Sequence, residues 1–240
     1  MWAGGSFTWP TPGDEDYIKR MLRIGREVIE RRSIDKIEYK EKGDMVFIHQ
    51  KREIWDSDLE GREGMWGVRE IRTHVFRPPS AASPTSTAST NTTTSTSTSM
   101  YKNKNTNMAK EKKEKASPLW PTTQPDISFT YTPTSPLLFR YSALTFNGHK
   151  IHYDHPHSIN TEGQPAPLVH GPLTATLLVE LADTAAREKD MAVIQFDYRA
   201  VGPIVVDREV EMVGWFEGGK LEMVARQDGR VGMKASALFA

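Results

Sequence analysis

One amphipathic stretch constrains the fold of this chain more than any other feature. Residues 171 to about 189 carry apolar side chains at helical spacing, in a stripe too wide for a single narrow contact. The stripe consists of Leu173, Leu177, Leu178, Leu181, Ala182 and Ala185. Pro172 suits the first turn of a helix, where its missing N–H costs no hydrogen bond. We therefore expect one long helix, wrapped by a curved sheet.

The segments on the C-terminal side of this helix predict an antiparallel sheet. Runs rich in β-branched and aromatic residues alternate with Gly and Asp turns, as is typical of strands joined by hairpins. The expected strands cover residues 193–200, 203–216, 221–226 and 231–239. Gly218 and Gly219 predict the hairpin turn between the second and third of them.

The N-terminal segment repeats the strand pattern without a convincing long helix. Strands are expected over residues 27–39, 45–55 and 65–76. Residues 22–28 and 204–210 both open a long strand that a hairpin and a closing strand follow. This placement suggests an internal duplication.

A low-complexity stretch divides the two parts. Residues 80–107 are almost entirely Ser, Thr, Asn, Ala and Pro, and a Lys/Glu run follows at 110–115. Such a composition buries too little apolar surface to offset the entropy of ordering, so we expect a disordered linker over 80–117. A Lys-rich docking site is the alternative. The predicted organisation is an N-terminal part (1–79), this linker and a C-terminal part (118–240).

Composition excludes several classes of protein. Lys plus Arg (31) balances Asp plus Glu (31), so no global field favours nucleic acid or a membrane surface, and neither partner is expected. The chain has no cysteine, which excludes disulfides, thiolate metal sites and a cysteine nucleophile. No run approaches the roughly 18 apolar residues of a membrane helix, which favours a soluble protein. Met1 is followed by no signal-peptide core, so we expect either a cytosolic protein or a missing upstream segment.

Two motifs gather the residues that could carry chemistry. Five of the seven histidines lie between His149 and His170. Within this region the chain reads SALTF-NGHKIHYD over residues 142–154 and HGPL over residues 170–173. The two motifs resemble the active-site signature of MaoC-like (R)-specific hydratases and dehydratases. The resemblance is closest to the branch of hydroxyacyl-thioester dehydratase type 2 and mesaconyl-C4-CoA hydratase.

This resemblance implies an α+β fold, a double hot dog in which antiparallel sheets wrap a central helix. It makes the C-terminal part the catalytic half and the N-terminal part a non-catalytic partial half. The helix of the N-terminal half would lie before Met1, so we expect that half to be truncated and to lack its helix. The low-complexity insert departs from the family pattern.

The resemblance also assigns roles to particular residues. His152 is the expected acid–base catalyst, because a neutral imidazole can accept the proton next to the thioester carbonyl and return one to the leaving hydroxyl. The wider family usually has aspartate at the position of Asn147, but asparagine cannot ionise and would only hold the hydroxyl or water. The backbone N–H of Gly171, at the start of the long helix, would stabilise the enolate-like oxygen.

Weaker roles fall to residues around these three. Supporting roles are expected for His149, Asp154 and His170, and contact with a substrate phosphate for Arg140 and Arg199.

Each assignment has a plainer alternative. His152 could be a buried histidine bonded to a carbonyl, Asn147 a turn residue, and both arginines surface ion-pair partners. Gly171 also suits a helix start for purely local reasons. The close spacing of the histidines at 149, 152, 155 and 157 could indicate a metal site. However, Pro156 interrupts this segment and the sequence offers no second cluster of ligands, so neither metal nor cofactor is expected.

The implied function is dehydration of 3-hydroxyacyl thioesters to trans-2-enoyl thioesters on acyl carrier protein, in mitochondrial fatty acid synthesis. One alternative is hydration of a short unsaturated dicarboxylic acyl-CoA, and another is a non-catalytic acyl-thioester binding protein or decayed copy. A thioesterase would need a carboxylate on the helix, where Glu180 and Asp183 are the only candidates. The expected partners are acyl carrier protein or a coenzyme A thioester, and a second copy pairing through the hot-dog sheets.

Overall fold

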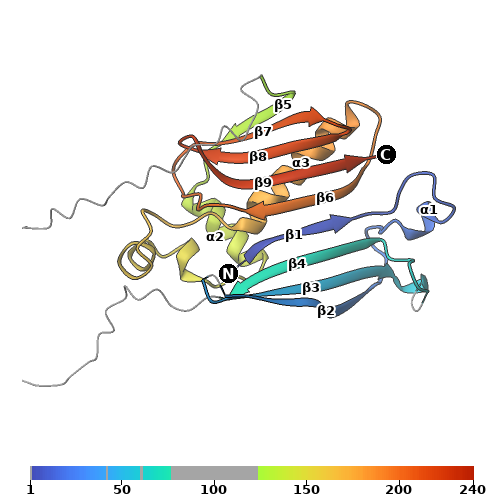
Figure 1. Ribbon diagram of the computed structural model, residues 1–240, viewed down its shortest axis with the longest axis horizontal. Coiled ribbons are helices and arrows are strands. Elements are labelled where there is room, and N and C mark those ends of the chain that lie inside the picture. Colours follow the sequence, from blue (N-terminus) through green and yellow to red (C-terminus); the bar gives the residue numbers. More distant parts are fainter. Residues whose placement is uncertain (1, 42, 60–61, 77–123) are drawn as a thin grey trace, which may run out of the picture. The chain divides into compact units, whose positions relative to one another are not determined.

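A computed structural model describes residues 2–41, 43–59, 62–76 and 124–240, which contain one antiparallel sheet of nine strands (Figure 1). The strand order is β2-β3-β4-β1-β6-β9-β8-β7-β5. The linker predicted over 80–117 lies outside the described residues. No helix in the described part of the chain is long and apolar enough to cross a membrane.

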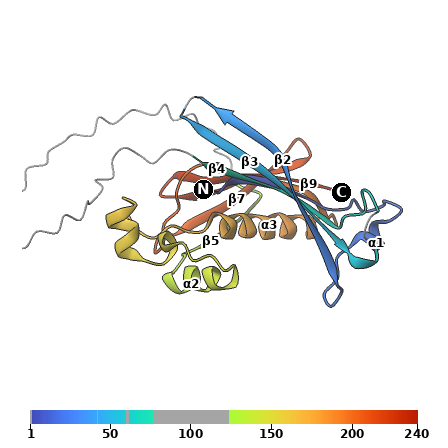
Figure 2. The same cartoon turned by 90° about the horizontal axis from the view of Figure 1, so that it is seen from below.

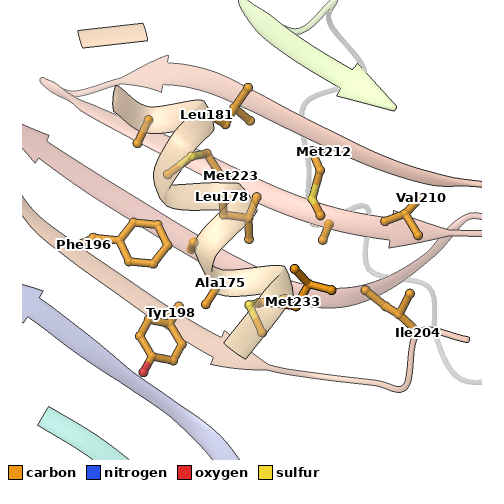
Figure 3. Packing of buried hydrophobic residues seen from close by; sticks show 14 of the residues in the cluster. Ala175, Leu178, Leu181, Phe196, Tyr198, Ile204, Val210, Met212, Met223 and Met233 are labelled. Atoms are coloured by element: carbon orange, nitrogen blue, oxygen red, sulfur yellow. The ribbon is translucent and has the colours of Figure 1, made fainter. Parts of the chain in front are cut away.

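The C-terminal half of the sheet wraps the predicted helix, α3 (Gly171–Arg187), which lies across one face of the strands in Figure 2. Its strands are β5 (Ile127–Tyr131), β6 (Val193–Ala200), β7 (Val210–Glu217), β8 (Lys220–Gln227) and β9 (Arg230–Phe239). The apolar stripe of α3 is buried against them, together with Phe196, Met212, Leu221 and Met223, each of which is fully buried (Figure 3). This is the α+β hot-dog arrangement predicted from the sequence.

The N-terminal half contributes β1 (Trp2–Thr8), β2 (Val28–Lys40), β3 (Met45–Asp56) and β4 (Val68–Phe76). Its described helices are the four-residue α1 (Tyr17–Arg20) and the 3-10 turn η1 (Ser57–Leu59). None of the described N-terminal residues forms a helix comparable to α3. The strands therefore form half a hot dog whose concave face no helix of their own covers.

The two halves join through β1 and β6, which pair antiparallel at the middle of the sheet (Figure 1). Outward from this junction the order is β4, β3, β2 on one side and β9, β8, β7 on the other. β5 lies at the outer edge beyond β7. Apart from β5, the arrangement of β6 to β9 repeats that of β1 to β4, with the first strand at the centre and the next strand furthest out, as a duplication would produce. Gly5 is required here, because a Cβ at this position would come within 2.6 Å of the Tyr198 hydroxyl.

Several elements differ from the sequence-based expectations. The strand expected over 203–216 begins only at Val210, because residues 203–209 form a separate irregular segment bridged to Leu168. Two strands and two helices were missed, namely β1, β5, the short helix α1 and the helix α2 (Ser135–Leu144). The signals for α2 were present, since Thr134 caps its N-terminus and Pro136 lies in its first turn.

Candidate active site

The candidate site lies in the segment that connects α2 to α3. After α2 the chain turns at Asn147, passes through the 3-10 turn η2 (Lys150–His152) and the short π-helical turn η3 (His157–Thr161), and returns at Leu168 to the start of α3. The Leu168 N–H donates to the Ile151 carbonyl at 2.9 Å, and Leu168 is bridged to Val205. This pairing ties the η2 turn to the entrance of α3.

His152 is fixed by a hydrogen bond that determines its tautomer. Its Nδ1 lies 2.8 Å from the Leu168 carbonyl oxygen, which can only accept. In the neutral ring the proton is therefore on Nδ1, and Nε2 carries the free lone pair. Burial lowers the pKa of His152 below its usual 6.5, the bond to Leu168 opposes this shift, and the nearby His149 adds to it. At neutral pH, Nε2 is a base.

His170 lies directly against this base. The two rings are stacked with their centroids 3.7 Å apart and an interplanar angle of 20°. His170 has no exposed surface, and its Nε2 lies within hydrogen-bond distance of the Ser142 Oγ, at 2.9 Å. Burial, followed by the proximity of His152 and His149, lowers its pKa to about 4. An uncharged His170 leaves His152 free to become the only imidazolium of the pair.

Asn147 presents its amide nitrogen rather than its oxygen. The Asn147 Oδ1 accepts the backbone N–H of His149 at 3.1 Å, which closes a local turn. Its Nδ2 makes no hydrogen bond with any described residue, so it remains as a donor. No described hydrogen bond joins Asn147 to His152. The turn role considered for Asn147 and the substrate role are therefore compatible.

Gly171 opens α3 immediately after His170, the ring on which His152 is stacked. Among the described residues, nothing accepts a hydrogen bond from the Gly171 N–H. The first N–H groups of a helix carry the positive end of its dipole, and Gly171 is the first of the 17 residues of α3. The His152 ring thus contacts His170, the residue that directly precedes Gly171 and its N–H donor.

The supporting residues differ in what they contact. The His149 ring is exposed, with its centroid 6.4 Å from that of His152. Asp154 caps the local chain, since its Oδ1 accepts the His157 N–H at 2.9 Å. Arg140 lies exposed on α2, next to Tyr141.

Arg199 is not brought to this site. On β6 the side chains of Phe196 and Tyr198 face α3, so the alternation along the strand points Arg199 to the opposite face of the sheet. Arg199 therefore lies on the face of the sheet opposite to α3 and makes no described contact with His152.

A metal site would need several ligand side chains close together, and a thioesterase would need a carboxylate of α3 close to the start of the helix. Within the described ranges, no group of three or more His, Asp or Glu side chains is placed to hold a metal ion. Glu180 follows Gly171 by nine residues, which is about 14 Å along the helix. Asp183 is paired with Arg187. Glu180 instead lines a groove of about 230 Å³ between β5 and α3, away from His152.

Sequence reasoning missed the residues that hold the two stacked histidine rings in place. The Leu168 carbonyl, the Ser142 hydroxyl and the Tyr141 ring, whose centroid is 4.9 Å from that of His170, all contact one of the two stacked histidines. Ser142 and Tyr141 come from α2, the helix that was not predicted. A helix assignment would have placed both on one turn near its C-terminal end.

Comparisons with known proteins identify the family of this chain. The family model for hydroxyacyl-thioester dehydratase type 2 matches residues 85–206, about half of the chain. The chain is 36% identical over 117 residues to mesaconyl-C(4)-CoA hydratase of Chloroflexus aurantiacus, covering 48% of this chain and 41% of that protein. It is 31% identical over 88 residues to the mitochondrial hydroxyacyl-thioester dehydratase type 2 of Schizosaccharomyces pombe, covering 37% of this chain and 29% of that protein. The chain thus spans less than half the length of these relatives.

Solved structures support the fold. A MaoC-like dehydratase from Phytophthora capsici superposes with a TM-score of 0.65 at 14% identity, covering 100% of this chain and 71% of that protein. The peroxisomal multifunctional enzyme type 2 of Drosophila melanogaster gives the same TM-score and identity, with 100% of this chain and 37% of that protein covered. With the His152 motif, the hot-dog sheet around α3 and the match over residues 85–206, this chain belongs to the hydroxyacyl-thioester dehydratase type 2 family of hydro-lyases.

Proposed function

We propose that the chain interconverts 3-hydroxyacyl and trans-2-enoyl thioesters, with His152 as its only acid–base group. The observation that carries this proposal is the 2.8 Å contact between the His152 Nδ1 and the Leu168 carbonyl, which leaves Nε2 unprotonated beside the start of α3. A positioned base with a pKa near or below neutrality suits proton abstraction next to a thioester carbonyl.

In the dehydration direction, His152 Nε2 takes the proton from the carbon next to the carbonyl as that C–H bond breaks. The electron pair moves into the thioester, whose oxygen becomes enolate-like and accepts the Gly171 N–H. The electron pair then returns from the thioester to form the double bond between C2 and C3 as the bond from C3 to its hydroxyl oxygen breaks, and the imidazolium returns its proton to that oxygen. Water leaves, and the neutral ring is restored.

Asn147 assists at the departing oxygen. Its Oδ1 is already bonded to the His149 N–H, so its Nδ2 is the group that donates to the hydroxyl or, in reverse, orients the attacking water. His170 contributes by remaining neutral beneath the ring of His152. A charged neighbour 3.7 Å away would oppose the imidazolium that forms during the reaction.

The carrier of the thioester is either acyl carrier protein or coenzyme A. It would approach along the exposed segment around Asn147, where Leu144 and Phe146 are 80% and 96% exposed. Arg140 and Lys150 are also exposed in this segment and could pair with a carrier phosphate. We also propose a mitochondrial location, because the fission yeast relative is a mitochondrial enzyme. A role in fatty acid synthesis and pairing of two copies through the sheets are further parts of the proposal.

The test is hydration of crotonyl-CoA, followed by the loss of enoyl-thioester absorbance. We expect His152→Ala to lower kcat by about 10²- to 10⁴-fold, the usual contribution of a general acid–base. The matched control is His155→Ala, because His155 is an exposed histidine of the same segment whose ring has one described hydrogen bond, to Ser135. Equal turnover by both variants would remove His152 from the reaction, and binding without turnover by the wild type would favour the non-catalytic alternative.

A further inference from the structure

Five charged side chains form a connected row on the N-terminal half of the sheet, here called the arginine row. Its members are Glu30, Arg32, Arg52, Glu70 and Arg72. Strand register places the whole row on the face that α3 covers in the other half. Arg72 is paired with Gly5, and Gly5 with the core residue Tyr198.

The row is built around a buried carboxylate. Glu70 is only 4% exposed and accepts from Arg52 Nη1 at 2.6 Å and from Arg72 Nε at 2.9 Å. Glu30 accepts from Arg32 and Arg52, and these two partners lower its pKa to about 2. Three guanidinium groups against two carboxylates leave the row with one net positive charge (3 − 2 = +1).

The arginines retain donors that the row does not use. Arg72 bonds to Glu70 through Nε and Nη2, and its Nη1 makes no hydrogen bond with any described residue. Arg52 likewise leaves its Nη2 without a described partner. The side chain of Arg72 is 36% exposed, so its unused donors can be reached by a ligand.

Arg72 lies at the end of the row nearest the candidate active site, on the strand next to β1. Gly5 lies between Arg72 and Tyr198, which are two strands apart, about 10 Å between Cα atoms, and the Tyr198 hydroxyl takes the place that a side chain of Gly5 would occupy. Tyr198 lies at the border of the core with its hydroxyl directed toward β1 (Figure 3). The charge of Arg72 also acts on Tyr141, whose ring contacts His170. Polar groups thus continue from the arginine row to the stacked histidines.

We propose that the arginine row binds a carboxylate at the far end of the acyl group, with Arg72 as the residue that selects it. This inference rests on the proposed function, since the acyl group must be held at His152 by its thioester end. An arginine fork with free N–H donors matches a carboxylate and gains a charge-assisted hydrogen bond. A long alkyl tail laid on the same face would desolvate guanidinium groups without offering them an acceptor.

The test compares pairs of trans-2-enoyl-CoA substrates with four, six and eight acyl carbons, each pair ending in either a methyl or a carboxylate. All six carry the same coenzyme A phosphates, so any difference within a pair comes from the acyl end. For the wild type we expect kcat/KM to favour the carboxylate at one of these lengths by about tenfold or more. Arg72→Gln should reduce this preference by about tenfold, and Arg72→Lys by less.

Arg69→Gln is the matched control. Arg69 is on the same strand and is also paired with a buried glutamate, Glu53, but it faces the opposite side of the sheet. We expect this variant to keep the wild-type preference. The methyl-ended substrates report whether each variant is folded.

Three results would overturn the inference. A wild type that favours the methyl end at every length would show that the row binds no acyl carboxylate. An Arg72→Gln loss of equal size on both members of a pair would assign Arg72 to the carrier phosphate or to folding. An Arg69→Gln variant that lost the preference would show that any charge on β4 suffices. If instead the wild type converts none of the six substrates, the proposed function itself fails.

Discussion

The two halves of the sheet share a strand order but differ in what lies on the face next to α3. In the C-terminal half, Met212 and Leu221 are fully buried against the helix. In the N-terminal half, the corresponding face carries the arginine row and, further out, Ile34 and Ile37, which are 54% and 63% exposed.

This difference shows that strand order does not determine where a sheet is stabilised. The C-terminal half gains apolar burial from α3, while the described N-terminal half depends on its hydrogen-bond ladder and on ion pairs. Partly exposed ion pairs contribute little to stability, whereas each fully buried large apolar side chain contributes about 1.5–3 kcal/mol. The candidate active site lies in the half that is packed.

The largest expected effect is on stability, and it should separate the two halves. Leu178 has no exposed surface in the centre of α3, so Leu178→Ala should lower the free energy of unfolding by about 2–5 kcal/mol. Ile34→Ala removes a half-exposed side chain on β2 and should cost less than about 1 kcal/mol. Urea unfolding followed by circular dichroism measures both. Equal losses would mean that the N-terminal half is packed as tightly as the C-terminal half.

A smaller effect is expected on the pH dependence of stability, to which one histidine in each half contributes. His170 has a folded-state pKa of about 4, below the 6.5 of the unfolded chain. Between these values the unfolded state binds more protons, so the stability from His170 is complete above pH 6.5 and is lost as pH falls toward 4. We expect a loss of about 2 kcal/mol between pH 6.5 and 4.5.

Replacing each histidine by phenylalanine isolates this contribution. His170→Phe should remove most of the loss of stability toward acid. Burial also lowers the pKa of His74 on β4, so His74→Phe should change the slope in the same direction but by less. Unfolding midpoints in urea at pH 4.5, 5.5 and 6.5 measure the pH dependence of stability of each variant. A larger change for His74→Phe than for His170→Phe would contradict the assignment of the acid-sensitive stability to His170.

The fold could be predicted from the sequence where a pattern was periodic. The stripe from Leu173 to Ala185 identified α3, and seven of the nine strands were anticipated, with bounds that agree to within three residues for all but β7. β1 was missed because Gly4 and Gly5 have weak strand propensity, and their role depends on Tyr198, a residue nearly 200 positions away. Such a requirement has no local signal.

The candidate site was predictable only in part. The motif identified Asn147, His152 and Gly171, but the tautomer of His152 depends on the Leu168 carbonyl and the neutrality of His170 depends on burial. The arginine row was invisible in the sequence, because Glu30, Arg52 and Arg72 meet only when three strands are in register. These properties arise from tertiary packing.

The pH dependence of kcat/KM for crotonyl-CoA hydration by the wild type tests most directly whether the His152 lone pair is the base. Because neutral His152 is the active form and burial lowers its pKa, kcat/KM should be flat at neutral pH and fall tenfold per pH unit below a single pKa under 6.5. A profile that rises toward acid would contradict the account, as would one that stays flat until a carboxyl group titrates near pH 4.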